Sequence, residues 1–346
     1  MTLLIDLLIS NSLIPKVLSD KADVVVAEMP TRKGWQMGTV HDLLTARGRQ
    51  ATLDLDLDRR VVEAASSYMT DEDASVAYLY SGWTQAALPH KKLADDEVWE
   101  IRTPRVTLLV EPGRKPNLVE GLPPLSVGVP YGSRARLIML YLQTEALKTN
   151  SREIELGRSL RAWFVRLGIP PGGKSIRDVR EQAERITRCR LTFHMAASGT
   201  NNGGLVNQSI VDGAIFGTHE EIADNTAFLE TVKLSESFFE QLKKHPVPIE
   251  EAAIRAISNN SQALDIYCWL SYRLHVLKSP TQVTWPALKA QFGTGYGKLA
   301  QFKFKFRPNL DLALAVYVDA KVEADERGLT LFPSKPPVSP RIFSIR

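Results

Sequence analysis

Hydrophobic residues recur at helical spacing along most of the chain. In its first half, this spacing predicts helices over 40–70, 133–148, 158–168 and 174–189. Ser133 is a candidate N-cap of the second of these helices, and Gly168 is a candidate glycine at the end of the third. The first half is therefore expected to be mainly helical.

Short alternating segments predict strands between these helices. Residues 105–111 and 151–157 each have the spacing or β-branched content of a strand. Residues 191–198 and 204–216 form a second pair, and the sequence GTNNGG at 199–204 between them tolerates left-handed backbone. We therefore expect a β-hairpin directly after the helix 174–189.

The second half of the chain repeats this order of elements without visible sequence similarity. A strand is expected over 227–235 and another over 281–285, and a hairpin over 320–334 with its turn at 324–328. Helices are expected over 235–244, 249–258, 261–277, 286–293 and 296–307. Pro286 fits the first turn of its helix, whereas Pro308 is expected to kink or restart the last one.

Helices joined by a short turn and followed by a hairpin have the order of a winged helix. The fold class is therefore α+β, mainly helical, with two tandem winged-helix domains. Residues 112–132 contain five prolines and four glycines, which marks a boundary between domains. The expected division is an extension at 1–36, a candidate for disorder, an acidic N-terminal segment at 37–130, and winged-helix domains at 131–225 and 226–340.

The charge of the chain is unevenly distributed. The 346 residues carry a formal net charge of only +4, and 24% of them are charged. Residues 131–200, however, hold 13 Lys/Arg against 6 Asp/Glu, net +7, and residues 301–346 hold 8 against 5, net +3. The remaining segments, 1–130 and 201–300, are net −4 and −2. Local clusters of positive charge, more than the total, favour binding to phosphate groups.

The sequence offers little for catalysis or for a metal. Its six histidines show no metal-ligand spacing, and its two cysteines cannot form a zinc cage or a disulfide framework. We therefore predict a protein of the reducing cytoplasm with no enzymatic activity, no cofactor and no metal. No apolar run reaches the roughly 20 residues of a spanning helix, and the N-terminus lacks the basic start of a secretion signal, so no membrane association is expected.

The helix 296–307 is the first candidate for DNA contact. Leu299, Phe302 and Phe306 form its predicted core stripe. Basic and amide side chains lie outside that stripe, a composition that suits phosphates and base edges in the major groove. These residues are Lys298, Gln301, Lys303, Lys305 and Arg307. A merely solvated basic face remains the alternative.

The helix 174–189 and the hairpin after it form the second candidate. Off its core stripe the helix carries Lys174, Arg177, Arg180 and Arg188. Glu181 and Glu184 alternate with these cations, so a salt-bridged surface helix is an equally good interpretation of this segment alone. Asn201 and Asn202 at the hairpin tip could enter a minor groove, or could serve only as turn residues.

One motif points to a different function. Residues 168–175, GIPPGGKS, match the spacing of a phosphate-binding P-loop. A P-loop follows a buried strand, however, and the preceding RSLRAWFVRLG has helical spacing. Two prolines would also stiffen the loop. The simpler interpretation is a glycine-rich turn before a basic helix, with a P-loop ATPase as the less favoured alternative.

Several long phrases of the chain resemble plasmid-encoded RepA-type replication initiator proteins. They include RARLIMLYLQTEALKTNSREIELGRSLRAWFVRLG, GGKSIRDVREQAERITRCRLTF and WPALKAQFGTGYGKLAQFK, and the resemblance extends over residues 38–340. The family pattern would continue the last helix smoothly where this chain has Pro308. Residues 1–36 do not share in the resemblance.

The resemblance implies a bacterial plasmid initiator. It implies two winged-helix domains that bind repeated double-stranded sites, the iterons, at the plasmid origin, help to open the duplex and recruit the host initiator and replicative helicase. It also implies a homodimer, and it assigns the recognition helices to 174–189 and 296–307. A transcriptional repressor that uses the same two units is the alternative within DNA-binding proteins.

Overall fold

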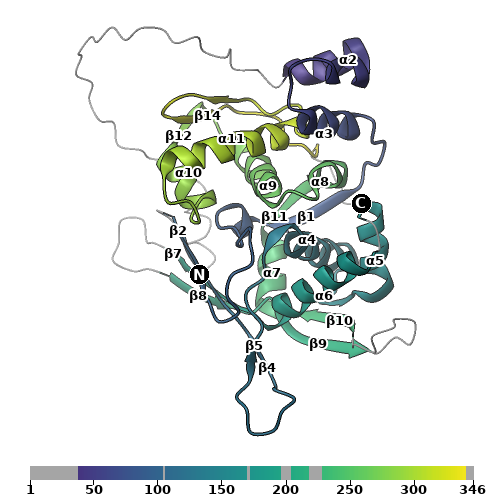
Figure 1. Ribbon diagram of the computed structural model, residues 1–346, viewed down its shortest axis with the longest axis vertical. Helices are drawn as coiled ribbons and strands as arrows, with labels where there is room; N and C mark the ends of the chain where they lie inside the picture. The colour runs from purple at the N-terminus through teal and green to yellow at the C-terminus, as the bar shows by residue number, and fades with distance from the viewer. Residues whose placement is uncertain (1–37, 104–105, 170–171, 196–203, 218–227, 340–346) are drawn as a thin grey trace, which may run out of the picture.

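The computed structural model describes residues 38–103, 106–169, 172–195, 204–217 and 228–339. It is α+β, as expected. Two groups of elements follow each other along the chain, and they occupy the lower and upper parts of the molecule in Figure 1. The strands form several small sheets, and the helices supply most of the core.

The first group is built around three helices and a small sheet. Its elements are α4 (Gly132–Thr149), β6 (Glu153–Glu155), α5 (Gly157–Arg166), α6 (Gly173–Arg188), β9 (Val211–Gly217), β10 (Phe228–Leu234) and α7 (Glu236–Lys244). β10 lies between β6 and β9 and is antiparallel to both. α4 is buried along most of its length because it contacts α6, α5 and α7. α7 begins where the Ser235 hydroxyl accepts a hydrogen bond from the Phe238 amide.

The second group repeats this arrangement. Its elements are α8 (Glu251–Ile257), α9 (Ser261–His275), β12 (Thr281–Thr284), α10 (Trp285–Phe292), α11 (Leu299–Ala315), β13 (Val322–Ala324) and β14 (Gly328–Leu331). The last strand again pairs with the first, in the order β12-β14-β13, just as β6-β10-β9 does in the first group. Thr284 caps α10 ahead of Pro286 in the first turn, as the sequence suggests.

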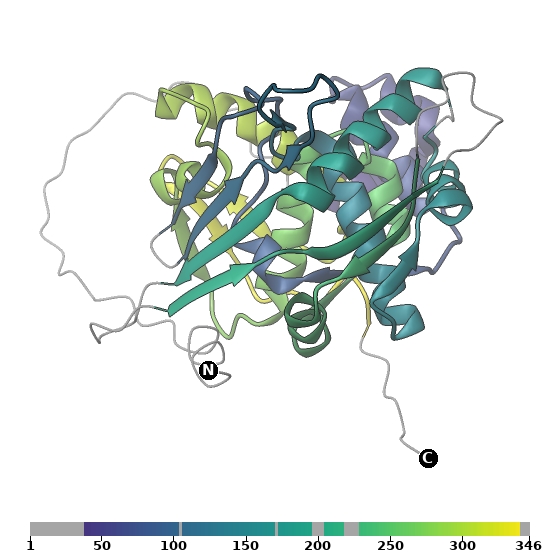
Figure 2. The ribbon, with the colours of Figure 1, turned by 90° about the horizontal axis from the view of Figure 1, so that it is seen from below.

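The N-terminal residues pack against both groups. α3 (Arg59–Met69) packs against α11 and α8, and α2 (Gly38–Leu53) packs on α3. β1 (Val76–Tyr80) pairs with β11 (Pro246–Glu250). Past the short helix η1 (Ser81–Thr84), the chain enters a four-stranded sheet of order β2-β3-β7-β8, seen from below in Figure 2. Its strands are β2 (Trp99–Arg102), β3 (Val106–Glu111), β7 (Arg190–Met195) and β8 (Gly204–Gln208).

The hairpin expected over 191–216 differs from the structure. β7 and β8 pair with each other, but β9 belongs to the other sheet, so the predicted single strand 204–216 is two strands. The break lies at Ser209 and Ile210, whose carbonyls accept hydrogen bonds from the Ser235 hydroxyl at 2.6 Å and the Ser235 amide at 2.9 Å. Ile210 is also buried, so the chain turns there toward α7.

Two further local expectations were wrong. α4 begins one residue before Ser133, and its N-cap is Tyr131. α11 runs through Pro308 to Ala315 as a single helix. Beyond the proline, the Asn309 side-chain amide donates to the Lys305 carbonyl at 2.9 Å and to Gln262 Oε1 of α9 at 2.6 Å. These bonds and the buried leucines of the last turns outweigh the single backbone hydrogen bond that proline removes.

A buried ion pair joins α4 of the first group to α9 of the second. Arg136 of α4 contacts Asp265 of α9 through two short hydrogen bonds, 2.6 Å from Nε and 2.7 Å from Nη2. Its other bonds go to the carbonyls of Leu88, Pro89 and Gly132. His90 lies beside it, and burial together with the Arg136 charge lowers the pKa of His90 to about 4, so this imidazole is neutral at neutral pH.

Gly168 ends α5 in a left-handed conformation, with φ at 71°. The Gly168 amide donates to the Val165 carbonyl and the Ile169 amide to the Phe164 carbonyl, the pattern of a Schellman cap. Because a Cβ there would meet no atom within 4 Å, the cost of Gly168→Ala is the backbone conformation alone. We expect the free energy of unfolding to fall by about 1 kcal/mol, measured by urea denaturation. Gly173 also has open space for a Cβ but an ordinary φ, so Gly173→Ala should lower the free energy of unfolding by less. Equal losses of stability in the two variants would contradict this explanation.

Candidate nucleic-acid interface

The helix α11 is anchored by an aromatic cluster. Phe302 and Phe306 are fully buried and pack edge-on against Trp285 of α10, with ring centroids 6.4 and 6.0 Å apart. Phe292 adds a fourth ring, 5.7 Å from Phe306. The predicted core stripe is thereby confirmed, with Leu299 packed at its edge. The cluster fixes which face of α11 points outward.

The five candidate residues of this helix divide into two groups. Lys298, Gln301 and Lys305 are exposed on the outer face, with Lys298 as the N-cap residue. The other two lie over Trp285: Lys303 Nζ is 5.4 Å and Arg307 Cζ is 5.5 Å from its ring centroid. Lys303 Nζ also donates to the Glu326 carbonyl in the β13–β14 turn at 2.9 Å. Arg307 is nevertheless exposed like the first three, whereas Lys303 is half-buried and also stabilises the packing of the turn.

The first basic helix, α6, is open at one end and covered at the other. Lys174 and Arg177 in its first turns are exposed. Arg188 in its last turn is half-buried, since Nε lies 3.5 Å from Glu184 and Nη1 donates to the Arg114 carbonyl at 3.2 Å. Arg180 is half-buried as well. Only the N-terminal part of α6 therefore presents cations to a large ligand.

The proline- and glycine-rich segment 112–132 covers the C-terminal end of α6. It contains the hairpin of β4 (Arg114–Lys115) and β5 (Leu125–Ser126), whose loop projects from the lower end of the molecule in Figure 1. Lys115 pairs with Glu184 at 3.2 Å. A Cβ at Gly113 would collide with the Arg188 carbonyl, so only glycine permits this close approach.

In the sequence, Arg185 looks like one more basic residue of α6. In the structure, it binds α6 to the segments around Asp95 and Val129. It is buried and donates to Asp95 at 2.9 Å, to Glu181 at 2.8 Å and to the Val129 carbonyl at 3.1 Å. Its Cζ also lies 5.2 Å from the ring centroid of Tyr131. The i,i+4 acid Glu181 was the only sequence signal for this role, because Asp95 and Val129 are remote in the chain.

The remaining predicted residues lie elsewhere. Asn201 and Asn202 fall outside the described residues. The P-loop-like motif lies between α5 and α6, so a helix stands where a P-loop needs a strand. Its first glycine is the cap of α5 and Gly173 is the first residue of α6. This arrangement matches the turn interpretation of the motif.

The described residues outside α6 and α11 offer few groups for catalysis or for binding a metal. Both cysteines are buried, and burial raises the pKa of Cys189 to about 12, so its thiol is protonated. Among the described residues no group of three His, Cys, Asp or Glu side chains could hold a metal ion. None of the helices in the described ranges is long and apolar enough to cross a bilayer.

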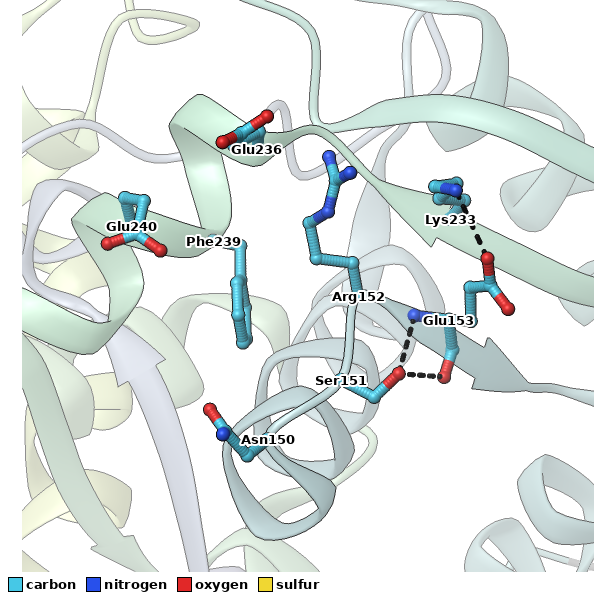
Figure 3. Close-up of a pocket in the computed structure, with 8 residues that line it drawn as sticks. All are labelled: Asn150, Ser151, Arg152, Glu153, Lys233, Glu236, Phe239 and Glu240. Carbon is cyan, nitrogen blue, oxygen red and sulfur yellow. Dashed lines mark hydrogen bonds and ion pairs between the residues drawn. The ribbon is translucent and has the colours of Figure 1, made fainter.

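A depression of about 450 Å³ lies between the end of α4, β10 and α7 (Figure 3). Its charged lining residues are Arg152, Lys233, Glu153, Glu236 and Glu240. Lys233 is already paired with Glu153 at 3.1 Å. With three carboxylates and two cations, this lining does not favour a phosphate group, and the depression is separate from the outer face of α11.

Comparison with known proteins finds a matching family and similar solved structures. Residues 129–286 match the family described as plasmid encoded RepA protein. A crystal structure of selenomethionine derivatives of domains 2 and 3 of RctB superposes with a TM-score of 0.47 at 10% identity, covering 75% of this chain and 100% of that one. A second RctB domain 2–3 structure gives 0.41 at 10% identity, with 72% and 86% covered. No curated protein sequence matches the chain.

Proposed function

We propose that this chain, whose residues 129–286 match the family described as plasmid encoded RepA protein, is a plasmid replication initiator that binds repeated double-stranded sites at the plasmid origin. Binding would promote opening of the duplex and recruitment of the host initiator and replicative helicase in the bacterial cytoplasm. The proposal includes homodimer formation and no catalytic step. Phosphate neutralisation would supply affinity and a few base contacts would supply register.

The order of elements supports two winged-helix units. In each group a helix and a strand precede two helices, and two further strands then complete a three-stranded sheet in which the last strand pairs with the first. We infer that α6 and α11 are the recognition helices and that the strand pairs β9–β10 and β13–β14 are the wings. In this arrangement the first unit includes β10 (Phe228–Leu234), so it extends past the boundary between 225 and 226 that the sequence predicts. The described residues from 38 to 103 pack against both units.

The outer face of α11 is the observation that carries the proposal. Lys298, Gln301 and Lys305 are exposed there, while the buried aromatic cluster holds the helix from behind. From Lys298 to Leu310 the sequence contains four cations besides Gln301 and Asn309 but no acid, with Asp311 as the first carboxylate. A purely solvated helix usually mixes both signs of charge, so this segregation favours a polyanionic partner.

The proposal is tested by replication and binding together. A mini-plasmid that carries the origin should replicate when the chain is supplied and fail without it. Fluorescence anisotropy should show tighter binding to an origin duplex than to a duplex of equal length from elsewhere on the plasmid. Binding at a promoter without support of replication would instead identify a transcriptional repressor.

The first unit yields a separate prediction. Replacing Lys174 and Arg177 with alanine should weaken origin binding and reduce the slope of log K against log salt by about 0.9 for each phosphate that is no longer neutralised. Arg188→Ala removes a positive charge from the covered end of α6, and we expect it to leave the slope unchanged. Equal slopes for all three proteins would show that α6 does not contact DNA.

A further inference from the structure

The segment 302–306 alternates phenylalanine with lysine, which would place three aromatic rings on one face of a strand. It is part of a helix instead, where residues four apart share a face and a residue midway between them lies opposite. Phe302 and Phe306 are buried, whereas Phe304 is left in solvent, with 73% of this residue exposed. The exposed side of α11 therefore carries a large aromatic ring next to basic side chains.

Phe304 lies in the middle of the outer face of α11. At 100° per residue it falls between Ala300 and Gln301, both exposed. Lys305 Nζ lies 5.5 Å from the centroid of the Phe304 ring, so a cation flanks it directly. A solvent-exposed aromatic ring contributes little to the stability of the fold, because aromatic residues stabilise a protein mainly when they are buried.

We propose that Phe304 is a specificity-determining residue that contacts the C5-methyl groups of thymines in the major groove of the bound site. This inference rests on the proposed function, with α11 as a recognition helix. Thymine is the only one of the four bases with a methyl group at the floor of that groove, and apolar side chains recognise it by excluding water from it. Gln301 and Lys305 on the outer face, and Lys298 at the start of the helix, would contact phosphates and base edges.

The charge around Phe304 favours DNA over a protein partner. The centres of protein interfaces are depleted in lysine, whereas this ring has Lys305 beside it and the exposed Arg307 three residues further along the helix. Protein–DNA interfaces are, by contrast, strongly positive and polar around a few base contacts. The exposed Phe304 ring and the cations near it therefore fit a DNA duplex that has thymine at the base pair contacted by Phe304.

The experiment compares thymine with its demethylated form. Two duplexes that span one footprinted origin site are made, one with thymidine and one with 2′-deoxyuridine throughout, and the full-length protein is titrated against each. For the wild type we expect binding to the deoxyuridine duplex to be about three- to fivefold weaker for each methyl group contacted. For Phe304→Ala we expect weaker binding to the thymidine duplex and a ratio near 1 between the two.

Lys298→Ala serves as the matched control, since it should weaken binding to both duplexes and keep the wild-type ratio. Thermal unfolding checks that Phe304→Ala is folded, which its exposure leads us to expect. A wild-type ratio of 1, or the same ratio in Phe304→Ala and wild type, would overturn the proposal while origin binding stands. A loss of self-association in Phe304→Ala with an unchanged ratio would overturn it in favour of a protein contact. Failure of the wild type to bind the origin at all would refute the proposed function itself.

Discussion

Replacing Asp265 with alanine is expected to lower the free energy of unfolding by about 3–5 kcal/mol, because it leaves the buried Arg136 guanidinium without its carboxylate. The exposed fractions of the two side chains are only 7% and 12%, so water cannot replace the missing partner. Arg136 would keep its bonds to three carbonyls, but those bonds do not neutralise its charge. Urea denaturation monitored by circular dichroism measures the change.

Two further variants separate the buried charge from a general effect of substitution. The double variant Arg136→Met/Asp265→Leu should recover part of the loss, since it removes both charges, although three carbonyls then lose a donor. Glu63→Ala removes the exposed i,i+4 partner of Arg59 and should change stability by less than about 0.5 kcal/mol. A loss for Asp265→Ala as small as that for Glu63→Ala would contradict a buried, structural ion pair.

The double variant Lys298→Ala/Lys305→Ala is expected to weaken origin binding on the order of tenfold. Both side chains are exposed on the outer face of α11, and neither packs in the aromatic cluster, so folding should be unaffected. If each lysine contacts a phosphate, the slope of log K against log salt should fall by about 1.8 for the pair. Anisotropy titrations over a range of about 50 to 200 mM salt determine both quantities.

The control is a pair of lysines outside the candidate interface. Lys244 at the end of α7 and Lys278 after α9 are exposed, so Lys244→Ala/Lys278→Ala removes the same net charge from other surfaces. Its salt slope should equal that of the wild type. If both double variants lower the slope equally, only the overall charge matters and α11 has no special role.

Periodicity was sufficient for the elements whose hydrophobic positions lie close together in sequence. The helices from 132 to 188, the hairpin at 322–331 and the core stripe of α11 were predicted from the local spacing of their apolar residues. Pairings between remote segments carried no such signal. β1 with β11 and β3 with β7 join segments that lie far apart in the chain, and nothing in either strand specifies its partner.

The basic residues of the candidate site were predictable, but their partners were not. Lys174 and Lys305 differ little in sequence from Arg185 and Arg188, yet the first two are exposed and the last two bind segments 95–129. Only the tertiary fold brings Asp95, Arg114 and Val129 to α6. For Phe304, the alternation of phenylalanine with lysine suggests a side chain buried like Phe302 and Phe306. Because the segment is a helix, Phe304 instead lies on the opposite, exposed face.

Footprinting on the origin of the plasmid that encodes this chain tests the central claim most directly. Hydroxyl-radical cleavage should show protection over repeated segments of the duplex at protein concentrations that leave neighbouring DNA unprotected. The same protection should require higher concentrations of Lys298→Ala/Lys305→Ala, and not of Lys244→Ala/Lys278→Ala. Uniform protection of origin and flanking DNA at one concentration, with both variants like the wild type, would contradict sequence-specific binding through α11.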